Sequence, residues 1–377
     1  MKILQVGKAY PPVNLGGVEV VIQLLTEGLN MKKYDCDALG VNDSYTFKAE
    51  LGKYGGIVFR TKLLFKAFST LFSFQLITEL GRIKSNYDII HIHSPDPMAA
   101  IALFICKPSC KVVLHWHSDI LKQKILLFFY KPILWWLINR ADLILATSPP
   151  YIEGSKYLTK SKFKTQVLPI GLNVEKIDVP IEIDRDYKRK FGNKKIIFSL
   201  GRLAYYKGFE YLILSAKFLA EDCIILIAGE GSEYERLNSI IIENYLTDKV
   251  ILMGKVSDYQ KAWLFENCFV FALSSIFKTE AYAIVQVEAM AYGKPIVSTR
   301  IEGSGVDWVN LDNYSGITVP TKDPESLGNA IKKILNDPGL CKEFSRNALK
   351  RYNQMFTYEV MIQKLIASYN ELNVHNK

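Results

Sequence analysis

Short apolar runs alternate with longer amphipathic stretches along the whole chain. In the first half, the runs that predict strands are Ile3–Val6, Ile89–Ile92, Val112–His115, Leu143–Ala146 and Gln166–Leu168. In the second half they are Ile196–Leu200, Ile224–Ala228, Val250–Met253, Val270–Leu273 and Ile296–Ser298. Helical periodicity lies between them, as in Val18–Leu29, Glu210–Ala220 and Ser232–Asn244. This alternation predicts an α/β protein with parallel sheets covered on both faces.

The alternation restarts after a charged segment, residues 177–190, which has no apolar periodicity. We therefore expect two Rossmann-like domains, residues 1–175 and 191–357, joined by a linker over 176–190. A length of 377 residues fits two domains. In such sheets ligands bind at the carboxyl ends of the strands, so we expect the site in the cleft between the domains.

The charge of the chain is uneven. The net charge is +9, and the excess lies in residues 1–170, which hold 21 Lys and Arg against 12 Asp and Glu. Its basic, aromatic-rich stretches, Phe59–Phe74 and Lys122–Arg140, are interpreted as helices suited to an anionic membrane surface. A solvated basic face with the apolar residues packed inward is the alternative.

No stretch reaches the roughly 20 apolar residues of a membrane-spanning helix, and the opening MKILQVG predicts a strand rather than a signal peptide. We therefore expect a cytoplasmic protein. Six scattered cysteines without a C-x-x-C pair predict reduced thiols rather than disulfides or a zinc site.

A glycine pair follows the first predicted strand. Gly16 and Gly17 open the next helix, where free N–H groups and close backbone approach favour a phosphate or a sugar hydroxyl. The loop is not the fingerprint G-x-G-x-x-G, so no nicotinamide cofactor is implied.

Two histidine pairs end apolar strands. His91 and His93, and likewise His115 and His117, are two residues apart and point to one face, with Asp96 and Asp119 close behind. Three interpretations stay open: a metal cluster, a cleft in which one histidine contacts a reacting sugar, and hydrogen-bonded structural histidines.

Two cations follow the strand Ile196–Leu200. Arg202 and Lys207 lie in a loop that enters a helix, a pattern typical of a diphosphate clamp. Gly229 and Gly231 after the next strand offer a second close backbone approach, and Gly254 lies in the segment expected near the nucleotide base.

The most informative pattern is the segment TEAYAIVQVEAMA, residues 279–291. Glu280 precedes a predicted helix and Glu288 lies within it. The amides around Ile284 and Val285 are expected to point at an anion at the helix N-terminus. A glutamate in so apolar a helix requires a partner.

These motifs, in this order, resemble those of the retaining glycosyltransferase family four of the GT-B fold, including members that build bacterial surface polysaccharides. The resemblance covers nearly the whole chain, from P-P…G-G-V-E through H-S-D and G-R-L…K-G to E-A-Y-A-I-V-Q-V-E-A-M and G-K-P. It implies that the last segment, Phe356–Leu372, forms a helix that returns to the first domain.

The resemblance also implies roles for the motif residues. Arg202 and Lys207 would hold the donor diphosphate, Glu288 the ribose, and Glu280 the donor sugar. His117 would lie near the reacting carbon, and Gly16 and Gly17 would close over the phosphates. The family often has glycine where this chain has Ala283, so we expect Ala283 to keep a negative φ.

The implied reaction is a same-face displacement with retention, driven by stabilisation of the departing nucleoside diphosphate. No metal or other cofactor is expected, because side chains supply the positive charge. Two D-x-D strings, Asp35 to Asp37 and Asp184 to Asp186, are interpreted as accidental. The alternatives are a nucleotide-sugar epimerase of the same fold, a metal-dependent hydrolase using the histidine pairs, and a non-catalytic sugar-nucleotide binding protein.

The expected substrates are a nucleotide sugar, of the GDP-mannose type or a UDP-hexose, and a saccharide or lipid-linked saccharide acceptor. No nucleic acid is expected as a partner. We expect peripheral association with the inner face of the cell membrane because of the charge asymmetry.

Overall fold

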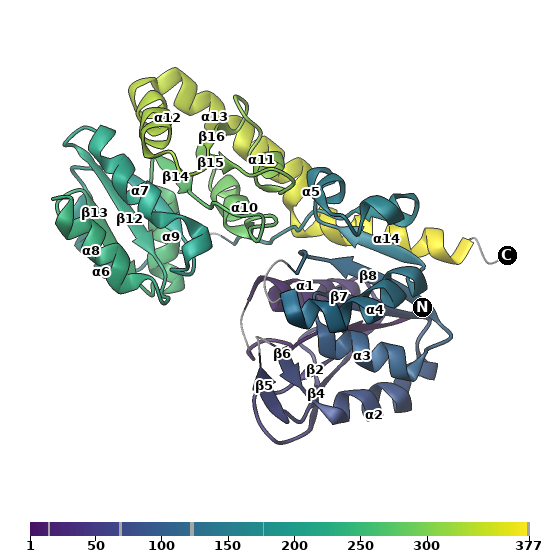
Figure 1. Cartoon of the computed structure of the whole chain (residues 1–377). Coiled ribbons are helices and arrows are strands. Elements are labelled where there is room, and N and C mark those ends of the chain that lie inside the picture. The colour runs from purple at the N-terminus through teal and green to yellow at the C-terminus, as the bar shows by residue number, and fades with distance from the viewer. Residues whose placement is uncertain (14–15, 68–69, 121–123, 176, 375–377) are drawn as a thin grey trace. The chain divides into compact units, whose positions relative to one another are not determined.

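The computed structural model describes residues 1–13, 16–67, 70–120, 124–175 and 177–374, which divide into two compact units (Figure 1). Unit 1 comprises Met1–Gly171 with Tyr358–Lys377, and unit 2 comprises Leu172–Thr357. The last helix, α14 (Tyr358–Val374), belongs to the first unit. The two parallel α/β sheets are confirmed.

Unit 1 is built on a sheet with the order β10-β9-β8-β7-β1-β2-β4-β3. All neighbours pair in parallel except β3 and β4. The strands are β1 (Lys2–Val6), β2 (Asp35–Val41), β3 (Lys48–Leu51), β4 (Ile57–Thr61), β7 (Ile89–Ser94), β8 (Lys111–Trp116), β9 (Leu143–Ala146) and β10 (Thr165–Val167). The helices, besides α14, are α1 (Gly17–Met31), α2 (Phe74–Ile83), α3 (Pro97–Cys106), α4 (Lys124–Arg140) and α5 (Pro149–Gly154).

Unit 2 is built on a fully parallel sheet with the order β13-β12-β11-β14-β15-β16. The strands are β11 (Lys195–Leu200), β12 (Cys223–Ala228), β13 (Val250–Gly254), β14 (Val270–Leu273), β15 (Ile296–Arg300) and β16 (Gly316–Pro320). The helices are α6 (Ile181–Phe191), α7 (Phe209–Ser215), α8 (Tyr234–Glu243), α9 (Asp258–Asn267), α10 (Ile284–Ala291), α11 (Val306–Val309), α12 (Pro324–Asn336) and α13 (Pro338–Arg351).

The core of unit 2 follows from the alternation of side chains along β11. Ile197 joins a buried cluster with residues of α7, α8 and α12. The next residue, Phe198, faces the other way and meets Phe265 of α9 edge-on, with ring centroids 5.0 Å apart. A strand buried on both faces is apolar throughout, which is why the strand segments were readable as continuous hydrophobic runs.

The charged segment that was interpreted as a linker is helical. Residues Ile181–Phe191 form α6, and the chain divides between the two units at Gly171, where residue 175 was expected to end the first domain. The helix is anchored on α9, where Trp263 Nε1 donates to Asp184 at 2.9 Å and the Tyr187 ring meets Trp263 edge-on at 5.0 Å. Phe191 at its end is buried. Ile183, Tyr187 and Phe191 lie four residues apart and form a narrow apolar stripe, in which the first two are half-buried and the last is buried.

The prediction of a helix in the basic stretch Phe59–Phe74 is wrong. The stretch contains the end of β4 and the two antiparallel strands β5 (Phe65–Ala67) and β6 (Thr70–Phe72). The Phe65 and Phe72 rings stack across this strand pair with their centroids 4.6 Å apart, a cross-strand pairing that favours strands. The second basic stretch is helical, as α4.

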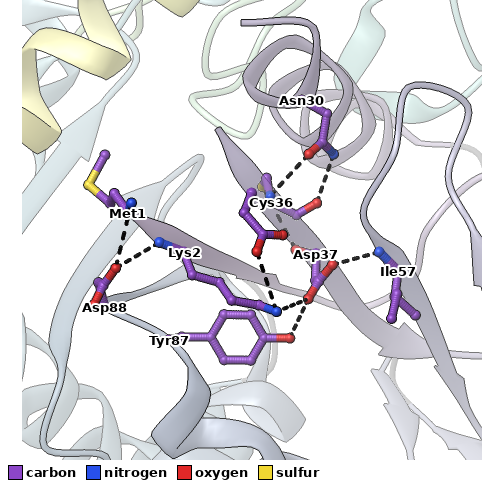
Figure 2. Close-up of polar contacts among 9 residues, drawn as sticks. Met1, Lys2, Asn30, Cys36, Asp37, Ile57, Tyr87 and Asp88 are labelled. Carbon is purple, nitrogen blue, oxygen red and sulfur yellow. Dashed lines mark hydrogen bonds and ion pairs between the residues drawn. The ribbon is translucent and has the colours of Figure 1, made fainter. Parts of the chain in front are cut away.

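The first D-x-D string has a structural explanation at the amino end of β2, as Figure 2 shows. Asp37 is buried and accepts hydrogen bonds from Ile57 N at 2.6 Å and Tyr87 Oη at 2.6 Å. Lys2 Nζ lies 3.7 Å from Asp37 and 3.5 Å from Asp35. This carboxylate pair ties β1, β2, β4 and the segment before β7 together.

Candidate functional site

A buried ion pair lies at the carboxyl end of the sheet of unit 2. Lys207, in the loop after β11, places Nζ 2.5 Å from Glu280 Oε2, and the two side chains are 9% and 10% exposed. Burial alone would lower the pKa of Lys207, but the Glu280 carboxylate outweighs it and the pKa is raised. Arg202 is exposed in the same loop, and its charge acts on Lys207. The predicted site residues Lys207 and Glu280 therefore form an ion pair, and the predicted Arg202 is close enough for its charge to act on Lys207.

Serine hydroxyls hold Glu280 in place. Ser275 Oγ donates to Glu280 Oε2 at 2.8 Å, and Ser304 Oγ donates to the Glu280 carbonyl oxygen at 2.5 Å. Both serines are fully buried. Sequence reasoning missed them, although Ser275 lies two residues after the apolar run that forms β14, where a polar residue near the strand end is a usable signal.

The helix α10 begins at a strained residue. Ala283, the residue before its first turn, has φ 60° and ψ 73°, so the expectation of a negative φ is wrong. The left-handed conformation turns the chain from Glu280 into the helix. Among the described residues no side chain caps this helix, and Ile284 and Val285 are half-buried. Their amides, like all first-turn amides, lack partners within the helix.

Glu288 lies on α10 and pairs with a lysine that the sequence interpretation did not include. Lys261 Nζ of α9 is 3.1 Å from Glu288 Oε1. Burial lowers the pKa of Lys261, while Glu288 raises it more, so the net shift is upward. The two residues line a cavity of about 270 Å³ together with Phe265, Tyr292 and residues 172–175 and 177. The partner that a glutamate in this apolar helix requires is thus Lys261.

The glycines after β11 and β12 bring two loops into direct backbone contact. Gly229 has φ +133°, and a Cβ built there would lie 2.0 Å from the Gly201 carbonyl oxygen. A Cβ on Gly231 would lie 2.2 Å from the Leu203 carbonyl oxygen. Gly254, at the end of β13, has φ +65° and accepts a hydrogen bond from Gly229 N at 2.8 Å. These contacts stack the three strand ends and shape the loop that carries Arg202.

In unit 1, Gly16 and Gly17 stand at the start of α1, and residues 14 and 15 lie outside the described part of the chain. The preceding loop is held by Arg60 of β4, a residue missed by sequence reasoning. Its Nη2 donates to the Pro11 carbonyl oxygen at 2.7 Å and its Nε pairs with Glu50 at 2.7 Å. An arginine inside an apolar strand was the available signal.

Four histidines share one face of the sheet of unit 1: His91 and His93 lie on β7, His115 lies on β8, and His117 directly follows β8. Burial is the main cause that lowers the pKa of His91 and of His117 to about 3, and it lowers the pKa of His93 and His115 well below its usual range. All four are therefore neutral at pH 7. His91, His93 and His115 place one nitrogen each within 4.8 Å of one another.

Both nitrogens of His93 are already hydrogen-bonded, to His117 and to Gln5, each at 2.9 Å. An ion bound by His91, His93 and His115 would have to break one of these bonds. The neighbouring aspartates also have structural partners: Asp96 caps α3, accepting from Met98 N at 3.1 Å, and Asp119 accepts from Trp116 Nε1 at 3.0 Å.

Unit 2 thus carries the ion pair of Lys207 and Glu280, with Arg202 in the same loop as Lys207, and the helix α10, on which Glu288 pairs with Lys261. Unit 1 carries His117, Gly16 and Gly17. The arrangement in unit 2 can bind an anion through cations and helix amides while two carboxylates contact hydroxyl groups.

Comparisons with known proteins agree with this chemistry. Residues 15–175 match the family described as Glycosyltransferase Family 4, and residues 180–351 match Glycosyl transferases group 1. The chain is 29% identical over 379 residues to O-antigen chain mannosyltransferase C of Escherichia coli, covering 99% of each chain. It is 28% identical to a D-rhamnosyltransferase of Pseudomonas aeruginosa, covering 95% of this chain and 92% of that protein. Its fold matches sucrose-phosphate synthase from Thermosynechococcus elongatus, with a TM-score of 0.80 at 19% identity and full coverage of both chains.

Proposed function

Because the chain belongs to the family-four glycosyltransferases, enzymes of the GT-B fold, we propose that it transfers a mannose-type hexose from a nucleotide sugar to a saccharide in surface-polysaccharide synthesis. The name of the E. coli relative, an O-antigen chain mannosyltransferase, supports this acceptor class and a mannose donor. The name of the P. aeruginosa relative, a D-rhamnosyltransferase, supports the transfer of a related sugar. GDP-mannose is the first donor to test and UDP-hexoses the second.

The observation that carries the proposal is the buried pair of Lys207 and Glu280 near the start of α10. A donor diphosphate would bind Lys207, Arg202 and the amides of Ile284 and Val285. Negative charge grows on the diphosphate as the sugar departs, so these groups stabilise the transition state more than the ground state.

Glu280 would then accept hydrogen bonds from the donor sugar and Glu288 from the ribose. His117 of unit 1 would contact the sugar near the reacting carbon, and Gly16 and Gly17 would approach the phosphates. Gly229, Gly231 and Gly254 would lie near the nucleotide. The acceptor hydroxyl attacks from the face that the diphosphate leaves, and a diphosphate oxygen takes its proton, so the anomeric configuration is retained.

We propose that no metal takes part, since Lys207 and Arg202 neutralise the diphosphate. The D-x-D strings support this: Asp35 and Asp37 are engaged with Lys2, and Asp184 and Asp186 lie on α6, where Asp184 accepts from Trp263. Turnover in the presence of EDTA is the test, and loss of turnover that Mg²⁺ or Mn²⁺ restores would contradict it.

We also propose that unit 1 docks on the anionic inner face of the cell membrane, where a lipid-linked acceptor would lie. Phe128 and Phe129 of α4 are each 73% exposed, and Lys131 beside them is exposed too. Aromatic rings flanked by lysines suit an anionic interface. Among the described residues, no helix has both the length and the apolar character to cross a bilayer.

Flotation with vesicles containing anionic lipid at low salt tests this docking. The double variant Phe128→Ser, Phe129→Ser should lose binding, whereas Tyr245→Ser, a control at a 93% exposed ring of unit 2, should bind normally. Equal binding to neutral vesicles, or no effect of the double variant, would contradict it.

The transfer itself is tested with purified protein, GDP-mannose or a UDP-hexose, and a lipid-linked saccharide. We expect nucleoside diphosphate release only when acceptor is present, and an α-linked product from an α-linked donor by NMR. Conversion of the donor without acceptor would instead indicate an epimerase. Full turnover by Glu280→Gln and His117→Ala variants would refute the assigned site.

A further inference from the structure

A continuous chain of buried hydrogen bonds runs through unit 1 from the C-terminal helix to His117. Tyr369 Oη of α14 contacts His91 Nδ1 at 2.5 Å and accepts from Gln5 Nε2 at 3.4 Å. Gln5 Oε1 of β1 contacts His93 Nε2 at 2.9 Å, and His93 Nδ1 contacts His117 Nε2 at 2.9 Å. Gln5 and Tyr369 are fully buried, and His93 is 1% exposed.

Register explains why these side chains meet. Gln5 of β1 pairs with His91 of β7, and His93 of β7 pairs with His115 of β8, so their side chains lie on the same face of adjacent strands. Tyr369 covers this face from α14. A glutamine at the centre of a hydrophobic strand is costly to bury unless its amide is fully used, and here both ends of the amide have partners.

The order of donors and acceptors fixes the protons. The amide oxygen of Gln5 is an acceptor, so His93 Nε2 must carry the hydrogen. His93 is neutral, because burial lowers its pKa well below the usual range, and its Nδ1 therefore carries only a lone pair. His117 Nε2 must then donate to it. His117 is neutral as well, which leaves its Nδ1 as an acceptor.

No described residue donates to His117 Nδ1, and this atom is not fully enclosed by the protein. Both ring nitrogens of His115, by contrast, are fully enclosed and have no hydrogen-bond partner among the described residues. His117 retains 6% exposure. The free lone pair is thus on the one ring of the cluster that solvent or a ligand reaches.

We infer that Gln5, through His93, is a positioning residue that holds His117 in the Nε2–H form, so that His117 Nδ1 accepts a hydrogen bond from a hydroxyl of the donor sugar. The inference rests on the proposed function for its ligand, but the proton arrangement itself does not. It gives a role to Gln5, His93 and Tyr369, three buried polar residues that take no part in the proposed contacts of Arg202, Lys207, Glu280 and Glu288 with the donor.

The proton arrangement is measured directly on the full-length protein with ¹⁵N-labelled histidine. The chain has only five histidines, so two-bond ¹H–¹⁵N correlation spectra are sparse, and the signals missing in His117→Gln identify residue 117. At pH 7.5 we expect His117 as the Nε2–H tautomer. Protonation at Nδ1, or an imidazolium, would overturn the inference without the need for any other variant.

The functional arm uses Gln5→Met, which keeps the length and removes the amide. We expect both tautomers of His117 and a fall in kcat of about tenfold, since small misplacements of a catalytic group have effects of that order or more. The KM for the donor should stay within about twofold, because the diphosphate contacts lie in unit 2.

Thr26→Val is the matched control. It removes another buried hydrogen bond of unit 1, from Thr26 Oγ1 to the Ile22 carbonyl oxygen at 2.7 Å, which is not one of the links between Tyr369 and His117. It should change neither the tautomer nor kcat. A folded Gln5→Met protein with an unchanged His117 spectrum and unchanged kcat would overturn the role of Gln5. Full turnover by His117→Ala would refute the proposed role of His117 in the transfer reaction. The inferred proton arrangement is tested independently by the measured tautomer.

Discussion

Replacing Glu280 by glutamine should destabilise the protein through Lys207. The variant keeps the shape of the side chain and a carbonyl oxygen for Ser275. It removes the carboxylate charge that lies 2.5 Å from Lys207 Nζ, and the structure describes no other ion pair of Lys207. Lys207 is 7% exposed, so water cannot replace that charge.

The expected magnitude follows from the burial of both partners. Removing one member of a buried pair costs about 3–5 kcal/mol, because the other charge is left uncompensated. We expect the lower end, about 3 kcal/mol, since the retained oxygen of glutamine still accepts from Ser275. The pKa of Lys207, raised by Glu280 in the native protein, should fall in the variant.

Urea unfolding followed by circular dichroism measures the loss. Asp186→Asn is the matched control, because Asp186 pairs with Arg189 at 3.2 Å but both side chains are largely exposed, at 65% and 82%. Such pairs contribute about 0–1 kcal/mol. If Glu280→Gln cost no more than this control, the pair would not be the buried interaction on which the proposed site depends.

A second test of the clamp uses an anion. Pyrophosphate should stabilise Glu280→Gln more than the native protein, since Lys207 then has no internal partner to give up. Equal stabilisation of the two proteins would indicate that the anion does not bind at Lys207.

The remaining predictions concern strain, acid and close packing. Ala283→Gly should stabilise the protein to thermal unfolding by about 0.5–1 kcal/mol, because relief of a left-handed alanine, about 1–2 kcal/mol, exceeds the entropy cost of glycine; a lower Tm would contradict this. Stability should fall as the pH drops below about 6.5 toward 3, because the unfolded chain protonates four histidines that the native protein keeps neutral, at up to about 1.4 kcal/mol per pH unit for each. Burial raises the pKa of Asp96 to about 6, so this one carboxyl gains stability as the pH falls and offsets only part of the loss from the four histidines. An unchanged midpoint of urea unfolding between pH 7 and 5 would refute the argument. Gly229→Ala should abolish donor binding or folding, since its Cβ would meet the Gly201 carbonyl oxygen at 2.0 Å, whereas Gly55→Ala, where nothing lies within 4 Å, should cost only backbone strain in calorimetry.

The fold was predictable where one physical pattern dominated. Ten strands were predicted from apolar runs, β9 and β14 to the residue and the other eight to within two residues. The strands β2, β3, β4 and β16 were not predicted, and β3 is exposed throughout. The segment 177–190 was interpreted as a linker because the apolar stripe of α6 is narrow and is completed by Phe191, outside that segment. The contacts of α6 to Trp263, a residue far along the chain, could not be read from the sequence. The strand pair of β5 and β6 was missed for a similar reason, since it is stabilised by the stacked rings of Phe65 and Phe72 across the two strands.

The site was predictable by residue type but not by partnership. Spacing after β11 and before α10 identified Lys207 and Glu280, yet only the structure pairs them and adds Ser275 and Ser304. Lys261 carries no motif, and its role as partner of Glu288 depends on the packing of α9 against α10. The sign of φ at Ala283 is a backbone property that a resemblance cannot give.

The central claim is that the loop after β11 binds the diphosphate of a nucleotide sugar, and thermal unfolding with GDP and UDP tests it most directly. A nucleotide at 100 times its Kd stabilises by about 2.7 kcal/mol. We predict that one of the two raises the Tm, that Arg202→Met requires at least about tenfold more of it, and that Arg189→Met, a change at another exposed arginine of unit 2, requires no more. No rise in Tm with either nucleotide, or an unchanged requirement in Arg202→Met, would contradict the claim.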